Sequence, residues 1–279
     1  MEKNPNAASS STSSRPPIAM GHRVAGVAYA EAVHSSNLAA ITHAGSVRPR
    51  NEDAFHVSAD GRFFVVADGM GGHQAGDVAA AIAVQTMADA YLRARGSAHS
   101  PADGSPERWI GDALVLAHEA ILRAAEADEH RSVGMGATLS AACVTDRWAS
   151  VCHAGDARAY HGASTTLRAV TTDHSLVASM VMAGEITWEM ARTHPKRNVV
   201  LQALGVALEP HPQVRRVAMD DGTHLLLCTD GLWESLRPAT LREVLGCGRT
   251  AIDCLRALVD HALEAGGADN MTAILYRHP

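Results

Sequence analysis

The chain has 279 residues, of which 47% are hydrophobic, and a formal net charge of −6, which allows one large or two small domains with a substantial core. The negative charge argues against a nucleic-acid binder, and no uninterrupted apolar run approaches the roughly 18 residues of a membrane span. We therefore expect a soluble, cytoplasmic monomer without nucleic-acid or membrane partners.

The N-terminal stretch differs in composition from the rest of the chain. Residues 1–35 contain a Ser-rich run followed by Pro16-Pro17, which buries too little surface to fold, so we expect a disordered or weakly ordered tail. Within it, an Ala- and Val-rich stretch from Val24 to Val33 could pack on the domain. Residues 36–279 show no repeat and no linker, so we expect one catalytic domain there.

The cysteine pattern is typical of a reducing compartment. The count is odd, no C-x-x-C pair occurs, and we expect structural thiols at Cys143, Cys152, Cys228, Cys247 and Cys254.

The first half of the domain predicts two strands followed by two helices. A strand is expected over 39–45, and the Asp60-Gly61 turn leads into an apolar strand that begins at Phe63 and reaches the surface at Asp68. A glycine-rich loop follows, in which the backbone can approach another group closely. Helices are expected over 77–95 and 107–127, and their one-sided apolar stripes are typical of helices that cover a sheet.

The second half is dominated by strand signals. Short strands in hairpin succession indicate an antiparallel sheet, and we expect them over 136–144, 148–155, 155–160, 166–170, 213–217, 223–229 and 271–276. A helix is expected up to Ala183 with Thr172 or Asp173 as its N-cap, and others over 241–245 and 251–265. The polar stretch 184–198 is expected to leave the sheet.

Three aspartates stand at ends of predicted strands beside glycines or small residues. They are Asp68, Asp230 and Asp269, and their recurrence predicts one acidic site collected from distant parts of the chain. Scattered carboxylates with a backbone carbonyl suit hard divalent cations such as Mg²⁺ or Mn²⁺, which keep several waters.

A pair of such ions predicts a hydrolytic reaction. Two ions roughly 3.5–4 Å apart can share one water and lower its pKa, which produces a hydroxide able to attack phosphorus. A cation must then hold the phosphoryl oxygens, a task that suits the planar fork of Arg. Arg48, upstream of Glu52-Asp53, is the first candidate and Arg50 the second.

Other chemistries have weaker support. Zinc is disfavoured because no two His or Cys have close ligand spacing, and a P-loop fails because no Gly-Lys-Ser/Thr follows the glycines. A Ser140/His153/Asp156 triad lacks the G-x-S-x-G elbow. For His73, a backbone-bonded loop histidine and a functional residue are equally supported.

Taken together, the motifs resemble those of the metal-dependent protein phosphatases, the type 2C serine/threonine phosphatases, and their bacterial branch in particular. The similarity runs from about Ile41 to Tyr276. The pieces, in order, are Arg48-x-x-Asn51-Glu52-Asp53-Ala54, Val66-Ala67-Asp68-Gly69-Met70-Gly71-Gly72-His73, Gly134-Met135-Gly136-Ala137-Thr138, His153-Ala154-Gly155-Asp156-Ala157-Arg158-Ala159-Tyr160, Thr172-Asp173-His174-Ser175, Leu227-Cys228-Thr229-Asp230-Gly231-Leu232 and Asp269-Asn270-Met271-Thr272.

The resemblance implies an α+β fold, an α-β-β-α sandwich of two antiparallel sheets flanked by helices, with two Mn²⁺ or Mg²⁺ ions and a weaker third. Asp68 would bridge the pair, and the Gly69 carbonyl, Asp230 and Asp269 would complete its protein ligands. Glu52 and Asp53 would act through metal-bound waters, Asp156 would help to bind the third ion, and Arg48 would hold the phosphate. The stretch 184–198 resembles the flap that bacterial members place over the cleft, and Asn198 would lie near the third ion.

Several positions depart from the family pattern. Ala137, Ala157 and Thr229 replace the commoner Thr, Ser and Ser at small, non-ligand positions, so metal binding should survive. Met70 stands where eukaryotic relatives carry a His proposed as general acid, so leaving-group protonation is expected from a metal-bound water.

The function implied is hydrolysis of phosphoserine and phosphothreonine in proteins, with a Ser/Thr kinase or its substrates as partners. Two alternatives stay open: a pseudophosphatase that binds phosphoproteins without turnover, and a signalling phosphatase controlled by a partner. The intact acidic set argues against the first, and the lack of a sensor domain weakens the second.

Overall fold

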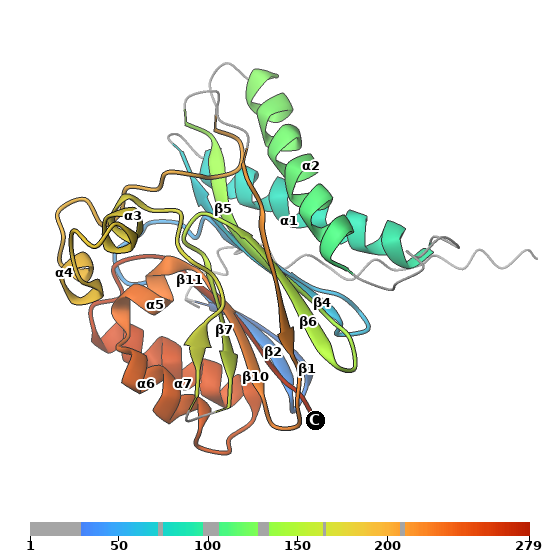
Figure 1. Cartoon of the computed structure of the whole chain (residues 1–279), viewed down its shortest axis with the longest axis vertical. Helices are drawn as coiled ribbons and strands as arrows, with labels where there is room; N and C mark the ends of the chain where they lie inside the picture. The colour runs from blue at the N-terminus through green and yellow to red at the C-terminus, as the bar shows by residue number, and fades with distance from the viewer. Residues whose placement is uncertain (1–28, 72–74, 97–105, 128–133, 164–165, 207–209) are drawn as a thin grey trace, which may run out of the picture.

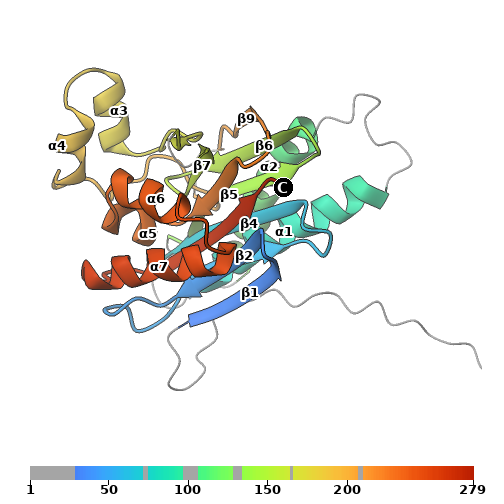
Figure 2. The ribbon, with the colours of Figure 1, turned by 90° about the horizontal axis from the view of Figure 1, so that it is seen from below.

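The computed structural model describes residues 29–71, 75–96, 106–127, 134–163, 166–206 and 210–279. The strands in these ranges form two antiparallel sheets that stack face to face, and helices cover both outer faces (Figure 1, Figure 2). The predicted α-β-β-α sandwich is therefore confirmed.

One sheet has five strands in the order β3-β4-β5-β6-β9. Their bounds are β3 Asp53–Val57, β4 Phe63–Met70, β5 Gly136–Val144, β6 Trp148–Ala154 and β9 Gln213–Ala218. Helices α1 (Ala75–Gly96) and α2 (Glu107–Glu126) pack on its outer face, as the apolar stripes predicted.

The other sheet has six strands in the order β1-β2-β11-β10-β7-β8. Their bounds are β1 Tyr29–Ser35, β2 Leu38–His43, β7 Arg158–Gly162, β8 Arg168–Ala169, β10 His224–Cys228 and β11 Met271–Arg277. Helices α5 (Asp230–Ser235), α6 (Pro238–Leu245) and α7 (Ala251–Glu264) cover it. The pairing of β2 with β11 brings the start of the domain beside its end.

Side-chain alternation along the strands explains where the site forms. In β4, Phe63 and Val65 pack beneath α1, whereas Phe64 and Val66 lie in the core between the sheets, because successive side chains point to opposite faces. Asp68 is the next member of the inter-sheet row. The same row that buries hydrophobic side chains in the middle of the sandwich therefore presents a carboxylate at its end.

Two predicted features differ from the structure. Tyr29–Ser35, inside the predicted tail, forms β1, because its backbone pairs with β2 from Tyr29–His43 to Ser35–Leu38. Residues 1–28, the rest of that stretch, lie outside the described residues. The strand from Phe63 also continues past Asp68 to Met70, paired with β5.

The N-cap of α3 (Leu176–Met182) is Ser175 rather than Thr172 or Asp173. Ser175 Oγ accepts a hydrogen bond from the Ala178 amide at 3.3 Å, and the Asp173 carboxylate is already bound to Arg158. The polar stretch 184–198, called the excursion below, also contains an unpredicted short helix, α4 (Trp188–Arg192), which Thr187 caps.

All five cysteines are free thiols, and Cys247 alone among them is exposed. Within the described ranges, none of the helices combines the length and apolar content needed to cross a bilayer.

Candidate metal centre

Asp53 and Asp68 face each other across two neighbouring strands. They are register partners in the β3–β4 pair, and both continue the rows whose inner members fill the core between the sheets. Asp53 is only 3% exposed. Two carboxylates are thus fixed next to each other at one end of the sandwich, where two like charges without a cation repel strongly.

Asp230 joins this pair from the six-stranded sheet. It is the first residue of α5, which follows β10 directly, and burial, followed by the negative charge of Asp230, raises the pKa of the Asp68 carboxyl group. The close approach depends on Gly231, because a Cβ there would collide with the Asn270 carbonyl oxygen. The glycine after Asp230 is therefore required for packing against the segment that carries Asp269.

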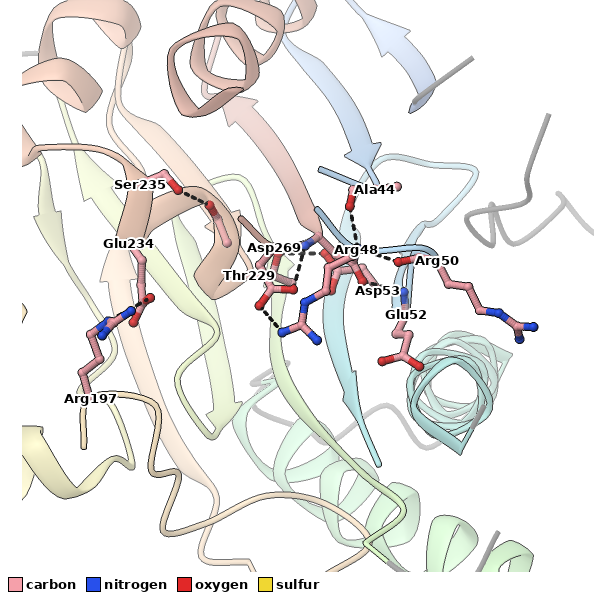
Figure 3. Close-up of polar contacts among 12 residues, drawn as sticks. Ala44, Arg48, Arg50, Glu52, Asp53, Arg197, Thr229, Glu234, Ser235 and Asp269 are labelled. Carbon is pink, nitrogen blue, oxygen red and sulfur yellow. Dashed lines mark hydrogen bonds and ion pairs between the residues drawn. The ribbon is translucent and has the colours of Figure 1, made fainter. Parts of the chain in front are cut away.

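Asp269 lies between α7 and β11, opposite the loop that carries Arg48. Arg48 Nη2 donates to Asp269 Oδ2 at 2.7 Å, and Figure 3 shows these two side chains pointing toward each other. Arg50, the second arginine candidate, points away from them in the same view. Arg48 thus lies at the acidic site, whereas the side chain of Arg50 points away from it.

Glu52 and Gly69 lie against the start of α1. The Gly69 amide donates to the Glu52 carbonyl oxygen at 3.2 Å, and a Cβ on Gly69 would collide with the Gly76 carbonyl oxygen. Burial, followed by the charge of Asp77, raises the pKa of Glu52. A glycine is needed at position 69, since no side chain fits between β4 and the first turn of α1.

Asp156 lies in the turn between β6 and β7 and is 5% exposed. Its backbone carbonyl accepts a hydrogen bond from Trp233 in α5. Burial, followed by the negative charge of Asp230, raises the pKa of the Asp156 carboxyl well above its usual range. Asp156 therefore lies within electrostatic reach of the other acids, next to Asp230.

Two residues that organise the site were not identified as such from the sequence. Asn270 accepts from the Glu52 amide and donates to the carbonyl oxygens of Ala44 and Arg50, each at 2.8 Å. Its position next to Asp269 was the available signal, but its partners are more than 200 residues away. Thr229 Oγ1 donates to Asp53 Oδ2 at 2.9 Å and so orients that carboxyl group.

The acids are electrostatically strained as a set. Burial, together with the negative charges of Asp230 and Asp269, raises the pKa of Asp53 to about 8 despite hydrogen bonds from Thr272 and Thr229. Burial and the charge of Asp230 likewise raise the pKa of Asp68. Cations bound nearby would offset the repulsion between these carboxylates and favour their ionised forms.

The donor set fits hard divalent cations. Asp53 Oδ1 and Asp230 Oδ1 are buried without a hydrogen-bond partner, and every candidate donor is an oxygen. Within the described ranges, no three carboxylate, imidazole or thiol groups already converge as a cage for one ion. Few protein ligands per ion, completed by waters, are what Mg²⁺ and Mn²⁺ sites commonly use.

The predicted Ser140/His153/Asp156 set lacks a catalytic arrangement. Ser140 and His153 are register partners, but Ser140 Oγ and His153 Nδ1 are both buried without a hydrogen-bond partner, while His153 Nε2 contacts the Thr172 carbonyl. No hydrogen bond therefore links the supposed nucleophile to its base. His73 lies outside the described residues.

The excursion 184–198 docks on α5 and on the segment that follows it. Arg192 Nη2 donates to the carbonyl oxygens of Glu234 at 3.0 Å and Leu236 at 3.1 Å. Arg197 lies 3.8 Å from the Glu234 carboxylate, a contact visible in Figure 3. The excursion thus contacts the helix that begins with Asp230.

Known proteins are similar to this chain in both sequence and fold. The family described as Protein phosphatase 2C matches residues 43–275. A serine/threonine phosphatase Stp from Listeria innocua is 35% identical over 237 residues, which cover 84% of this chain and 92% of that protein.

Solved structures agree with the sequence comparison. The Mycobacterium tuberculosis serine/threonine phosphatase PstP superposes with a TM-score of 0.76 at 29% identity, over 90% of this chain and 99% of that one. A PstP catalytic domain in complex with two manganese ions has a TM-score of 0.74 at 30% identity, over 86% and 96% of the two chains. This chain therefore belongs to the protein phosphatase 2C family of Mn²⁺- or Mg²⁺-dependent serine/threonine phosphatases.

Proposed function

We propose that the acidic end of the sandwich hydrolyses phosphoserine and phosphothreonine in proteins by direct attack of water, without a phospho-enzyme. The observation that carries this proposal is that Asp53, Asp68, Asp230 and Asp269 interact electrostatically although they come from four separate segments, and that the buried Oδ1 atoms of Asp53 and Asp230 have no hydrogen-bond partner. Paired cations, when bound there, supply a water of lowered pKa and neutralise the charge of the phosphoryl group.

Each residue has a proposed role. Asp68, the Gly69 carbonyl, Asp230 and Asp269 would hold the two ions. Glu52 and Asp53 orient the waters around the ions, and Asp156 helps to hold a weaker third ion. The burial of Asp53 and Asp156 and the mutual charge interactions of the acids support the assignment.

Arg48 is proposed to bind the phosphate. Its side chain is 52% exposed and engages Asp269 through Nη2, so the rest of its planar fork can meet an incoming dianion. Its positive charge also interacts with Asp68 and Glu52, which supports a position at the mouth of the site. Arg48 would orient the phosphoryl group for in-line attack and stabilise the charge of the transition state.

The partners proposed are phosphorylated proteins. A Ser/Thr kinase, or the substrates of one, is the source of such proteins that family analogy supports. Removal of the phosphate by this chain would reverse that kinase.

The test is hydrolysis of phosphoserine, phosphothreonine and phosphotyrosine peptides by the purified chain, before and after EDTA and after addition of Mn²⁺. We expect turnover of the first two peptides, loss with EDTA and recovery with Mn²⁺. Calorimetry of Mn²⁺ binding to the chain and to Asp230→Asn gives an independent readout. Turnover that resists chelation would refute the metal assignment, and phosphopeptide binding without turnover would identify a binding module instead.

A further inference from the structure

Two cysteines contact the same backbone oxygen beside the turn that joins α6 to α7. Cys247 follows the end of α6, and Cys254 lies in the first turn of α7. Both thiols contact the Val244 carbonyl oxygen, Cys247 Sγ at 2.8 Å and Cys254 Sγ at 3.3 Å. Because both sulfurs contact one oxygen atom, their separation cannot exceed the sum of those two distances.

The two thiols differ in their access to solvent. Cys247 is exposed, whereas Cys254 is fully buried. The other cysteines are buried in strands β5, β6 and β10. One sulfur of the pair can therefore meet a soluble reagent, and the other lies behind it within reach.

Positive charge surrounds the pair. Arg277 Nη2 donates to Cys254 Sγ at 3.1 Å and to the Leu245 carbonyl oxygen at 3.2 Å, and Arg277 Nη1 donates to the Arg249 carbonyl oxygen. Desolvation raises the pKa of Cys247, but the hydrogen bond from the Arg249 amide and the positive charge of Arg249 are among the interactions that outweigh it and leave that pKa lowered. These surroundings favour the thiolate of Cys247, the form that reacts with oxidants.

We propose that Cys247 and Cys254 form a redox-active pair that closes to an intramolecular disulfide in the presence of hydrogen peroxide. The proposal concerns a site separate from the acidic centre and does not depend on the proposed function. It assigns Cys247 as the thiol that is oxidised first and Cys254 as the one that resolves the product.

The steps balance as a two-electron oxidation. The Cys247 thiolate attacks one peroxide oxygen, the O–O bond breaks, and hydroxide leaves, which gives a sulfenic acid at Cys247. Cys254 then loses its proton and attacks the Cys247 sulfur. The S–O bond breaks, the S–S bond forms, and oxygen departs as water. Two thiols are oxidised, one peroxide is reduced to two waters, and a thiol reductant reverses the change.

Arg277 has a defined part in the second step. Burial raises the pKa of Cys254 to about 11, so this thiol is protonated before it attacks. The guanidinium hydrogen bond at 3.1 Å stabilises the sulfur as it becomes a thiolate. Cys254 should therefore resolve Cys247 more slowly when that donor is absent.

The test treats the full chain under native conditions with hydrogen peroxide, blocks free thiols and maps the peptides by mass spectrometry. We expect one cross-link between Cys247 and Cys254, which dithiothreitol removes. Cys247→Ser should lose the cross-link and leave Cys254 reduced. Cys254→Ser should accumulate a sulfenic acid at Cys247 that dimedone traps.

Cys143→Ser is the matched control, because this thiol is buried in β5, and it should keep the cross-link at the wild-type level. Arg277→Met should lengthen the lifetime of the dimedone-trappable intermediate several-fold, with native folding checked by circular dichroism. Oxidation of Cys247 without any link to Cys254, or equal oxidation of Cys254 in Cys247→Ser and wild type, would overturn the proposal.

Discussion

Trp233 Nε1 donates a buried hydrogen bond of 2.9 Å to the backbone carbonyl oxygen of Asp156. Trp233 lies one turn after Asp230 in α5, so this contact joins the helix of one acid to the turn of another. The indole is held in turn by Arg158, whose Cζ lies 3.3 Å from the ring centroid and whose guanidinium binds Asp173 at 2.6 Å. Trp233 thereby fixes the relative position of two candidate ligands.

Replacement of this donor should weaken the third ion site. Trp233→Phe keeps an aromatic face for Arg158 but leaves the buried Asp156 carbonyl unpaired, which should cost about 1–3 kcal/mol of stability. We expect half-maximal activation to need several-fold more Mn²⁺, with KM for p-nitrophenyl phosphate little changed at saturation. Mn²⁺ titrations and urea unfolding measure both effects. Trp148→Phe, at an exposed indole, is the control, and an unchanged Mn²⁺ requirement would contradict the role.

Asp230 should be essential for activity and unfavourable for stability without metal. Asp230→Asn should lower kcat on the order of 10³-fold or more, because a group that holds charge at the reacting centre is lost. In EDTA the variant should be more stable than wild type by about 1–3 kcal/mol, the scale of close like-charge repulsion in a protein. Asp221→Asn, at an exposed turn, should change neither quantity. Near-normal hydrolysis by Asp230→Asn would remove it from the site.

Arg48 and Arg50 form a natural pair of variants, since both lie in the β2–β3 connection but only Arg48 binds Asp269. Arg48→Ala should reduce kcat/KM by about 10²–10³-fold through the loss of a charged donor to the phosphoryl group. Arg50→Ala should stay within a few-fold of wild type. Steady-state kinetics on a phosphothreonine peptide measure kcat/KM for both variants. Equal effects of the two changes would exclude a specific role of Arg48 in phosphate binding.

Asn270 should affect both stability and catalysis. Asn270→Ala removes the hydrogen bonds to the Glu52 amide and to the carbonyls of Ala44 and Arg50. We therefore expect the free energy of unfolding to fall by about 2–4 kcal/mol. Because these bonds hold the loop that carries Arg48, kcat should fall even at saturating Mn²⁺. Asn270→Asp can accept a hydrogen bond from the Glu52 amide but cannot donate one to the two carbonyls. Its stability and its kcat should therefore lie between those of wild type and Asn270→Ala. Wild-type kcat in both variants would show that this loop is held by other contacts.

His174 should contribute to acid sensitivity. Its ring stacks on His153 with centroids 4.5 Å apart, and burial, followed by the charge of His153, lowers its pKa from 6.5 to about 4. Between pH 6.5 and about 4, His174 is therefore protonated in the unfolded chain but remains neutral in the folded chain. The stability contribution is complete above pH 6.5 and is lost as pH falls, by at most about 1.4 kcal/mol per pH unit.

His174→Asn should make urea-derived stability less dependent on pH in that window, because Asn does not titrate there. His211→Asn, at an exposed position, should keep the wild-type slope. Identical slopes for His174→Asn and wild type would show that acid sensitivity arises at other groups.

The sequence by itself determined the local elements and the kind of chemistry. Apolar periodicity identified the long helices and most strands, because burial of one face depends on residues close together in the chain. Carboxylates placed where hydrophobic strands end indicated hard cations without any knowledge of neighbours. Short features that depend on tertiary contacts were missed or misplaced, namely β1, α4, α5 and the Ser175 cap.

Only the tertiary structure decided which acids meet and what holds them. The Asp53–Asp68 register follows from strand pairing, while the contacts of Asn270 with Glu52 and of Arg48 with Asp269 each span more than 200 residues. The distinction between Arg48 and Arg50, and the shared contact of Cys247 and Cys254 with the Val244 carbonyl oxygen, likewise appear only after folding. Local preference cannot encode the contacts of Asn270 and Arg48, because they arise from the packing of segments that are far apart in the chain.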